Sequence, residues 1–167
     1  MSSILKVDTI QNTGGTTGLT IDSAGRVDAK VPMFHATRSA NVTSASPYVP
    51  IYDTVVYDTD SWYSTSNGRY TPQKAGYYYF MGQWSLASTN TAHYISISLR
   101  KNGGARFNTV MYGDASTYPR PQVFGTFYMN GSSDYVEVYN EFGGGANAIW
   151  TSVLGNNFLG HYLGSGS

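Results

Sequence analysis

The sequence contains no cysteine, which excludes disulfide bonds, zinc–thiolate sites and thiol nucleophiles together. Charge is also scarce, because ten basic and ten acidic side chains make up 12% of the 167 residues and cancel to a formal net charge of zero. A chain without net positive charge does not attract the phosphates of nucleic acids, so nucleic acid is not expected as a partner. No apolar run approaches the ~20 residues of a membrane span, so membrane insertion is not expected either.

Hydroxyl side chains take the place of the missing charges. The chain has 19 Ser and 17 Thr, together with 15 Tyr and 19 Gly. Its hydrophobic content of 41% is enough for a packed core, whereas helix formers are few. This composition favours an ordered, tyrosine-rich β protein.

Residues 1–31 differ from the rest of the chain. They contain no aromatic residue, and glycines divide their apolar residues into stretches too short to close a core. Disordered tails rarely keep an alternation such as Leu5-Lys6-Val7-Asp8. We therefore interpret residues 1–31 as an attachment arm that pairs its strands with a neighbouring subunit or a larger assembly; a frayed terminus is the alternative. The attachment residues expected in the arm are Leu5, Val7, Ile10, Leu19 and Ile21.

Residues 32–167 predict a second domain made of short strands. In one of them Ile95, Ile97 and Leu99 alternate with polar residues, as in a strand with one wet face. About eight to ten such strands follow residue 31, and no window has the 3.6-residue periodicity of a helix. The pattern indicates an antiparallel sandwich or barrel.

Three Asn-Gly dipeptides divide these strands. They are Asn67-Gly68, Asn102-Gly103 and Asn130-Gly131, and each lies between two runs of strand-forming residues. Asn-Gly supplies the positive φ angles that tight hairpin turns need. We therefore predict that each dipeptide joins two neighbouring antiparallel strands.

Two strands carry bulky side chains on both faces. They are Tyr77–Trp84 and Val123–Met129. An antiparallel sandwich needs only one apolar face per strand, so the second face must meet something else. Tyrosine suits a subunit interface because its ring buries area while its hydroxyl keeps a hydrogen bond. A thick aromatic core with a few exposed rings is the alternative. The interface residues expected here are Tyr77, Tyr79, Phe124 and Tyr128.

No catalytic or metal-binding constellation stands out. His35, His93 and His161 fall in separate predicted strands without ligand spacing, and we interpret them as structural. Asp58 and Asp60 are close enough to share a cation or to act as an acid–base pair, but a solvated turn beside a tryptophan is the favoured interpretation. We therefore expect no enzyme activity, no catalytic residue, no metal and no cofactor.

Loops rich in Tyr, Ser, Thr, Asn and Gly offer adaptable contact surfaces, because rings stack on a partner and hydroxyls supply hydrogen bonds. Such loops occupy Tyr112–Pro121 and Gly143–Trp150, and a tryptophan–tyrosine pair lies at residues 62 and 63. A surface glycan is the expected ligand for these rings, although each ring could equally close a hairpin or fill an interface. The ligand-contact residues expected are Trp62, Tyr63, Tyr112, Tyr118, Arg120 and Trp150.

The stretch Asn67–Phe80 resembles the hallmark of the globular head of the complement first-component recognition subunit, a branch of the tumour-necrosis-factor-like jelly rolls. Three further pieces follow in the family's order, at Ser98–Gly103, Val123–Val138 and Asn157–Leu163. The resemblance covers about residues 33 to 163 and departs from the family at Gly131–Asp134, where a compact Gly-Asp is usual. It implies an all-β, antiparallel ten-stranded jelly-roll sandwich, with Val123–Val138 holding paired strands. It also implies a homotrimer formed about a threefold axis through aromatic strands.

The arm carries a second resemblance. Ile4–Asn12, Leu19–Asp22 and Gly25–Val27 are similar to the N-terminal segment of many tailed-bacteriophage fibre and appendage proteins. The collagen stalk of the animal heads has no counterpart here, since the sequence has no Gly-x-y repeat. The two resemblances together imply a phage virion protein: a trimeric fibre or appendage head at the particle surface, held by its arm to other virion proteins and contacting the host surface. A capsid decoration or head-fibre protein without a host ligand is the alternative.

Overall fold

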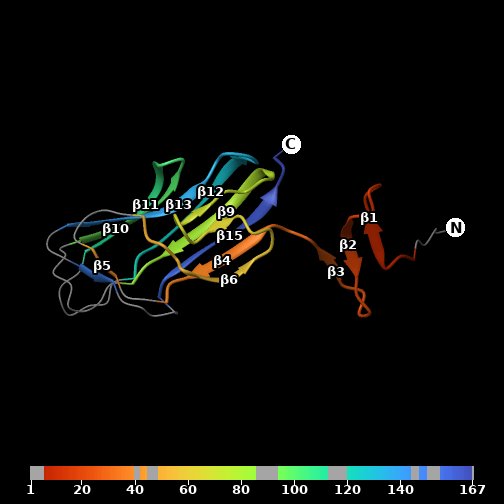
Figure 1. Cartoon of the computed structure of the whole chain (residues 1–167), viewed down its shortest axis with the longest axis horizontal. Helices are drawn as coiled ribbons and strands as arrows, with labels where there is room; N and C mark the ends of the chain where they lie inside the picture. The colour runs from red at the N-terminus through yellow and green to blue at the C-terminus, as the bar shows by residue number, and fades with distance from the viewer. Residues whose placement is uncertain are drawn as a thin grey trace. The chain divides into compact units, whose positions relative to one another are not determined.

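The structure is a computed structural model of the full chain, and it describes residues 6–39, 42–44, 49–85, 94–112, 120–143, 147–149 and 155–166. The chain divides into two compact units, Met1–Val31, here called the arm, and Pro32–Ser167, here called the head. Within the described residues the regular elements are all strands, and these strands pair antiparallel, which confirms the all-β prediction (Figure 1). The described part has no helix that is long and apolar enough to cross a membrane.

The arm is a three-stranded antiparallel sheet. Its strands are β1 (Thr9–Gln11), β2 (Thr17–Ile21) and β3 (Val27–Ala29), in the order β1-β2-β3. The alternating residues Lys6, Val7 and Asp8 precede β1 and Leu5 lies outside the described residues, whereas the three strands pair with one another. The strand addition to a neighbouring subunit that the sequence suggested is not needed to complete this sheet.

The head is a sandwich of two five-stranded sheets, with a two-stranded pair beside them in the described residues (Figure 1). Sheet I has the order β12-β9-β15-β4-β6, and sheet II has the order β11-β10-β13-β8-β7. The strands of sheet I are β12 (Gln122–Asn130), β9 (Ala75–Gln83), β15 (Asn157–Gly164), β4 (Met33–Thr37) and β6 (Thr54–Asp58). Those of sheet II are β11 (Gly104–Tyr112), β10 (Tyr94–Lys101), β13 (Val136–Gly143), β8 (Arg69–Tyr70) and β7 (Tyr63–Ser64). The small pair consists of β5 (Val42–Ser44) and β14 (Asn147–Ile149).

Aromatic rings fill the space between the two sheets. Phe34 of β4 is fully buried, with its ring centroid 4.0 Å from that of Tyr70 in a stacked pair and 4.9 Å from that of Phe158 in an edge contact. Phe80 of β9 and Ile97 of β10 are also completely buried. The alternation of the strands puts these side chains on the inner faces, so the core forms because both sheets turn their apolar sides toward each other.

A glycine in β15 makes room for two of these rings. A Cβ atom added at Gly160 would lie 2.6 Å from Phe80 Cδ1 and 2.9 Å from Phe34 Cε1, whereas one added at Gly164 of the same strand would meet nothing within 4 Å. We expect Gly160→Ala to lower the free energy of unfolding by about 1–3 kcal/mol through overpacking. Gly164→Ala is the matched control and should change it by less than about 0.5 kcal/mol in urea unfolding. Equal effects of the two substitutions would contradict this packing.

Two of the predicted Asn-Gly hairpins are confirmed. Asn102 and Gly103 join β10 to β11, which pair along their whole length, and their φ angles are 52° and 76°. Both values lie in the left-handed region that this turn chemistry supplies. Gly68, with φ of 73°, lies in the turn between the paired strands β7 and β8.

The hairpin predicted at Asn130-Gly131 is wrong. The strand before it, β12, pairs with β9 in sheet I, whereas the strand after it, β13, pairs with β10 and β8 in sheet II. The segment therefore crosses from one sheet to the other. Asn130 Oδ1 holds the crossing by accepting backbone N–H bonds from Ser132, Ser133 and Asp134, each 3.0 Å long.

A carboxylate fixes this crossing to the β10–β11 turn. Asp134 is buried and accepts from Lys101 Nζ at 2.8 Å, from Asn102 Nδ2 at 2.7 Å and from the Asn130 N–H at 3.0 Å. Burial by itself raises the pKa of Asp134, but the hydrogen bonds from Lys101, Asn102 and Asn130 outweigh it and hold the pKa below its ordinary value.

We expect Asp134→Asn to lower the free energy of unfolding by about 1–3 kcal/mol at neutral pH, because Lys101 and the Asn130 N–H lose a charged acceptor. A carboxyl whose folded-state pKa is depressed stabilises the fold fully above its unfolded pKa of about 3.9, and this stabilisation is lost as the pH falls through the folded-state value. Urea unfolding of both proteins should therefore give a difference that shrinks below about pH 4. A difference independent of pH would contradict the role assigned to the carboxylate.

Candidate functional site

The outward side of sheet I carries rings, as the two-faced strand pattern predicts. In β9 Tyr78 and Phe80 are buried, whereas Tyr77 on the other side is 44% exposed. In β12 the outward-facing Phe124 and Tyr128 are 61% and 46% exposed. The apolar and aromatic side chains on this side, here called the uncharged face, are Met33, His35, Tyr57, Tyr77, Tyr79, Met81, Phe124, Tyr128, Leu159 and His161.

Strand pairing holds these rings in contact with one another. Tyr77 and Tyr128 are cross-strand partners, and their ring centroids lie 5.4 Å apart. Tyr79 and His161 are partners across β9 and β15, also with centroids 5.4 Å apart. Because neighbouring strands restrict the rotamers of these rings, the face is already ordered before it meets anything.

Four of the five strands behind this face lack formal charge, and the fifth, β6, ends at Asp58. No Asp, Glu, Lys or Arg occurs at any position of β4, β9, β12 or β15. Exposed sheet surfaces are normally protected from association by charged side chains, and a contiguous exposed apolar patch is typical of an interaction surface. The uncharged face therefore has the character of a protein contact.

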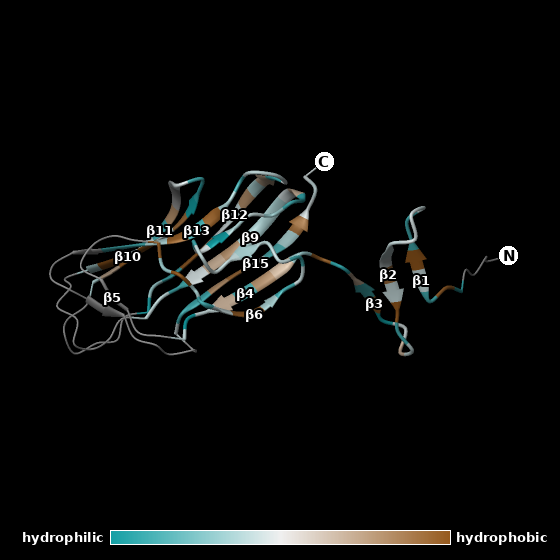
Figure 2. Cartoon of the chain, in the orientation of Figure 1, coloured by the Kyte–Doolittle hydropathy of each residue, from teal (hydrophilic) through white to brown (hydrophobic). Residues whose placement is uncertain are grey.

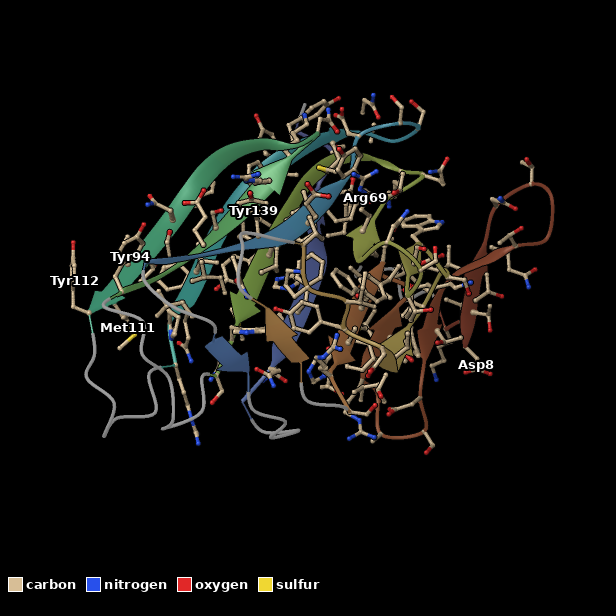
Figure 3. All side chains as sticks on the ribbon, turned by 60° about the vertical axis from the view of Figure 1, so that its left-hand side comes forward. Asp8, Arg69, Tyr94, Met111, Tyr112 and Tyr139 are labelled. Carbon is tan, nitrogen blue, oxygen red and sulfur yellow. The ribbon has the colours of Figure 1, made fainter. Side chains whose placement is uncertain are left out.

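The outward side of sheet II is the opposite in character. Arg69 Nε lies 2.9 Å from Glu137 Oε2, and the Arg100 guanidinium lies 3.1 Å above the ring of Tyr139 (Figure 3). Arg100 also approaches Glu141 at 3.8 Å. Ser96 and Ser98 of β10 lie on this side and are only 7% and 6% exposed, so the wet serine face predicted for β10 is wrong. Ion pairs and cation–π contacts of this kind suit a surface that stays in water.

A second apolar surface lies along the free edge of sheet II. β11 is the edge strand, and its last residue, Tyr112, is 80% exposed. Tyr94 lies opposite Tyr112 in the register, and Figure 3 places both beside Met111 at one end of the β10–β11 hairpin. The members of this edge strip are Tyr94, Phe107, Val110, Met111 and Tyr112, each at least 37% exposed. Sequence reasoning found only Tyr112; the absence of charge from Phe107 to Tyr112 was the signal for the others.

Trp62 and Tyr112, two of the residues predicted for ligand contact, do not share one site. Trp62 is half-buried against the core beside β7, whereas Tyr112 ends β11, and these two strands are the opposite edges of sheet II. Four strand spacings of ~4.8 Å separate them, which is about 19 Å. Arg120 is exposed beside β12, and Tyr118 and Trp150 lie outside the described residues.

Tyr63 is a core residue, which corrects its expected role in ligand contact. Its side chain is 9% exposed, its hydroxyl donates to the Tyr52 carbonyl at 3.0 Å, and the same oxygen accepts from the Tyr52 N–H at 3.1 Å. Burial raises the pKa of this hydroxyl above its ordinary value. The ring serves the packing of β7 against Phe158 and does not offer a surface for stacking.

The histidines and the acid pair have ordinary structural surroundings. His35 in β4 shares a hydrogen bond of 2.9 Å between its Nε2 and Asn157 Oδ1, and His161 lies in β15, whereas His93 is outside the described residues. Asp58 Oδ2 accepts from the Tyr63 N–H at 2.7 Å, and Asp60 donates its N–H to the same carboxylate. In the part of the chain that the structure describes, no three His, Asp or Glu side chains gather as metal ligands.

Three of the attachment residues expected in the arm share one sheet, and Val7 precedes its first strand. Ile10 lies opposite Leu19 in the register, and Ile21 follows two residues later in β2. Ile10 is 47% exposed, whereas Val7, Leu19 and Ile21 are half-buried. Leu5 lies outside the described residues.

Comparison with known proteins identifies the family of the head. A profile of the C1q domain matches residues 33–119, which is more than half of the chain. The chain belongs to the C1q domain family. The resemblance seen in the Asn67–Phe80 stretch is thereby confirmed for the head. A search of curated proteins found no match.

Solved structures agree on the fold. Murine APRIL at pH 5.0 is similar at a TM-score of 0.65 and 14% identity, over 80% of this chain and 100% of that one. The globular domain of zebrafish complement 1qA is similar at a TM-score of 0.58 and 17% identity, over 80% of this chain and 98% of that one. The tumour necrosis factor Eiger of S. frugiperda is similar at a TM-score of 0.57 and 11% identity, over 82% of this chain and 95% of that one. The head of this C1q-family chain is therefore a jelly roll of the tumour-necrosis-factor-like type.

Proposed function

We propose that this C1q-family chain is a phage virion protein that acts as a homotrimeric fibre or appendage head, anchored by its arm to other virion proteins and contacting the host surface. The observation that carries the assembly is the uncharged face, where Tyr77, Phe124 and Tyr128 are each more than 40% exposed on strands that have no charged residue. The phage setting is supported by the resemblance of residues 4–27 to the N-terminal segment of phage fibre and appendage proteins.

Two different apolar surfaces on one domain favour a ring. If the edge strip of one copy packs on the uncharged face of the next, the contact is heterologous, and such contacts close into a cyclic oligomer when the rotation permits. In a ring of three copies, the edge strip and the uncharged face of every subunit are both covered. Tyr77, Tyr79, Phe124 and Tyr128 lie within the contact on this proposal, and the charged outer side of sheet II faces water.

The proposed trimer also restricts where a host ligand can bind. Tyr112 belongs to the edge strip and is covered by the neighbouring copy, and Tyr63 is buried in the core. Trp62 and Arg120 remain near the surface, and Tyr118 and Trp150 complete the set proposed from the sequence. We propose contact with a surface glycan through these residues and no catalytic role.

Electron microscopy of intact phage particles labelled with a gold-conjugated antibody against this chain tests the proposal. Gold at the tips of fibres or appendages is the expected result. Gold spread evenly over the capsid shell, combined with absence of binding of the purified protein to host cells, would instead establish the decoration alternative. Particles without any label would contradict a virion role altogether.

A further inference from the structure

The sheet of the arm has one mainly apolar face, on which Thr17 of β2 is the polar member. Ile10 lies opposite Leu19, Leu19 lies opposite Ala29, and Ile21 lies opposite Val27. Residues directly opposite each other in antiparallel strands, and residues two apart in one strand, project to the same side. These five side chains therefore share one face, here called the arm face. The other side carries Thr9, Thr20 and Asp28, which are also aligned across the strands.

Two loops of the same construction fix this sheet locally. In the first, Asn12 Oδ1 accepts the N–H groups of Gly14 and Thr16 at 3.0 and 2.9 Å. In the second, Asp22 Oδ1 accepts those of Ala24 and Arg26, each at 2.9 Å. Such side-chain turns specify a hairpin without help from tertiary contacts. The two loops therefore fix which residues of the three strands lie opposite one another, and so which side chains lie on the arm face.

The arm itself supplies no second layer for the arm face. None of residues 6–31 is buried, and the apolar Ile10 and Val27 are 47% and 64% exposed. Figure 2 shows brown, hydrophobic colour on β1 of the arm as well as in the sheets of the head. A sheet with one apolar face needs a second layer to be stable, and the arm has none of its own.

We propose that the arm face is covered by the same face of the other copies of this chain, so that three arm sheets pack around a common axis as a stem. The inference rests on the proposed trimer of the head. Residues 1–31 contain three basic and three acidic side chains, so three arms bring no net side-chain repulsion with them. The contact layer consists of Ile, Leu, Val and Ala side chains with Thr17 beside them, and a second copy of the same residues matches it in polarity.

The short connection to the head makes this contact effective. Only Lys30, Val31 and Pro32 separate the end of β3 from the start of β4, and three extended residues span about 10 Å. Five side chains are far fewer than the roughly 20–30 residues a side of a standard interface, so the arm face would not hold free copies together. Tethering to a trimeric head raises the local concentration of the arms into the range of mM, which compensates for the small area. The polar side and the residues before β1 then remain available to the particle.

The absence of native cysteine permits a direct test by cross-linking of the full chain. Leu19→Cys places a thiol at the centre of the arm face, and Thr20→Cys places one on the polar side of the same strand. Each variant is oxidised with copper phenanthroline or treated with a short bis-maleimide, then run on a denaturing gel without reductant. We expect a strong linked-dimer band for Leu19→Cys and at least about tenfold less for Thr20→Cys, because a disulfide forms only when the two Cα atoms lie within about 7 Å.

The mass of each reduced variant, measured by light scattering, separates the inference from the proposed trimer. A trimeric mass with selective linking at residue 19 supports the stem. A trimeric mass with no linking, or with equal linking at residues 19 and 20, overturns the stem and leaves the head trimer intact. A monomeric mass for both variants and for the parent chain overturns the trimer and the stem together.

Discussion

Phe124→Asp is expected to convert a trimer of this chain into a folded monomer. Phe124 is 61% exposed on the outward side of β12, so its removal takes little from the core of its own subunit. In the proposed trimer the same ring is covered by a neighbour, and a carboxylate there would be desolvated without a partner, at a cost of several kcal/mol. Light scattering should give one chain mass of 18.2 kDa for the variant and three times that for the parent protein.

Thr65→Asp is the matched control, because it adds the same charge at an exposed position of the turn between β7 and β8. It should leave the mass and the near-ultraviolet circular dichroism unchanged. A trimer that survives Phe124→Asp would contradict the placement of Phe124 in the interface. Loss of the near-ultraviolet signal in Phe124→Asp would show instead that Phe124 supports the fold of its own subunit. We do not expect this loss, because the side chain is 61% exposed.

Phe34→Ala is expected to lower the free energy of unfolding by about 3–5 kcal/mol, the cost of a cavity left by a large core side chain. Phe34 is completely buried, and its ring stacks on those of Tyr70 and Tyr63 at centroid distances of 4.0 and 5.5 Å. Both sheets contribute to this cluster, so truncation weakens the contact that holds the sandwich together. Against a typical total stability of about 5–15 kcal/mol, the loss is enough to unfold a marginal head.

The measurement is urea unfolding in the Phe124→Asp background, where association does not add to the stability of the fold. Phe34→Leu keeps most of the volume and is the control, with an expected loss of less than about 1.5 kcal/mol. A loss below about 1 kcal/mol for Phe34→Ala would contradict a close-packed aromatic core at this position.

The local parts of the fold could be predicted from the sequence. The alternation in β10 and the turn at Asn102-Gly103 both depend on residues that are neighbours in the chain, and both hairpin strands are present as expected. The turn at Asn130-Gly131 has the same chemistry, but the strands around it belong to different sheets. That outcome depends on Asp134 binding Lys101 and Asn102, more than 30 positions away, which no local pattern reveals.

The candidate surfaces divide in the same way, into features that a local pattern predicts and features that depend on residues far apart in the chain. The exposed rings Tyr77 and Phe124 could be predicted because a strand with bulky residues on both sides must leave one side outside the core of a sandwich. The burial of Tyr63 could not be predicted, because it depends on contacts with Tyr52, which precedes β6, and with Phe158 of β15. The edge strip required the order of the strands in sheet II, which places β11 at an edge.

The outward sides of the two sheets of the head differ in charge, and this difference indicates which side takes part in assembly. Sheet I has an outward side with no formal charge, whereas the outward side of sheet II holds Arg69, Glu137 and Arg100 in ion pairs and ring contacts. A soluble monomer would expose the outward sides of both sheets to water, but only the charged side of sheet II is suited to that exposure. We infer that the first side is where copies of the chain meet.

The mass of the full chain in solution tests this claim most directly. Size-exclusion chromatography with multi-angle light scattering at micromolar concentration is predicted to give three times the chain mass of 18.2 kDa. A stable, monodisperse species of a single chain mass would contradict the account, because the rings of Tyr77, Phe124 and Tyr128 would then be tolerated in water.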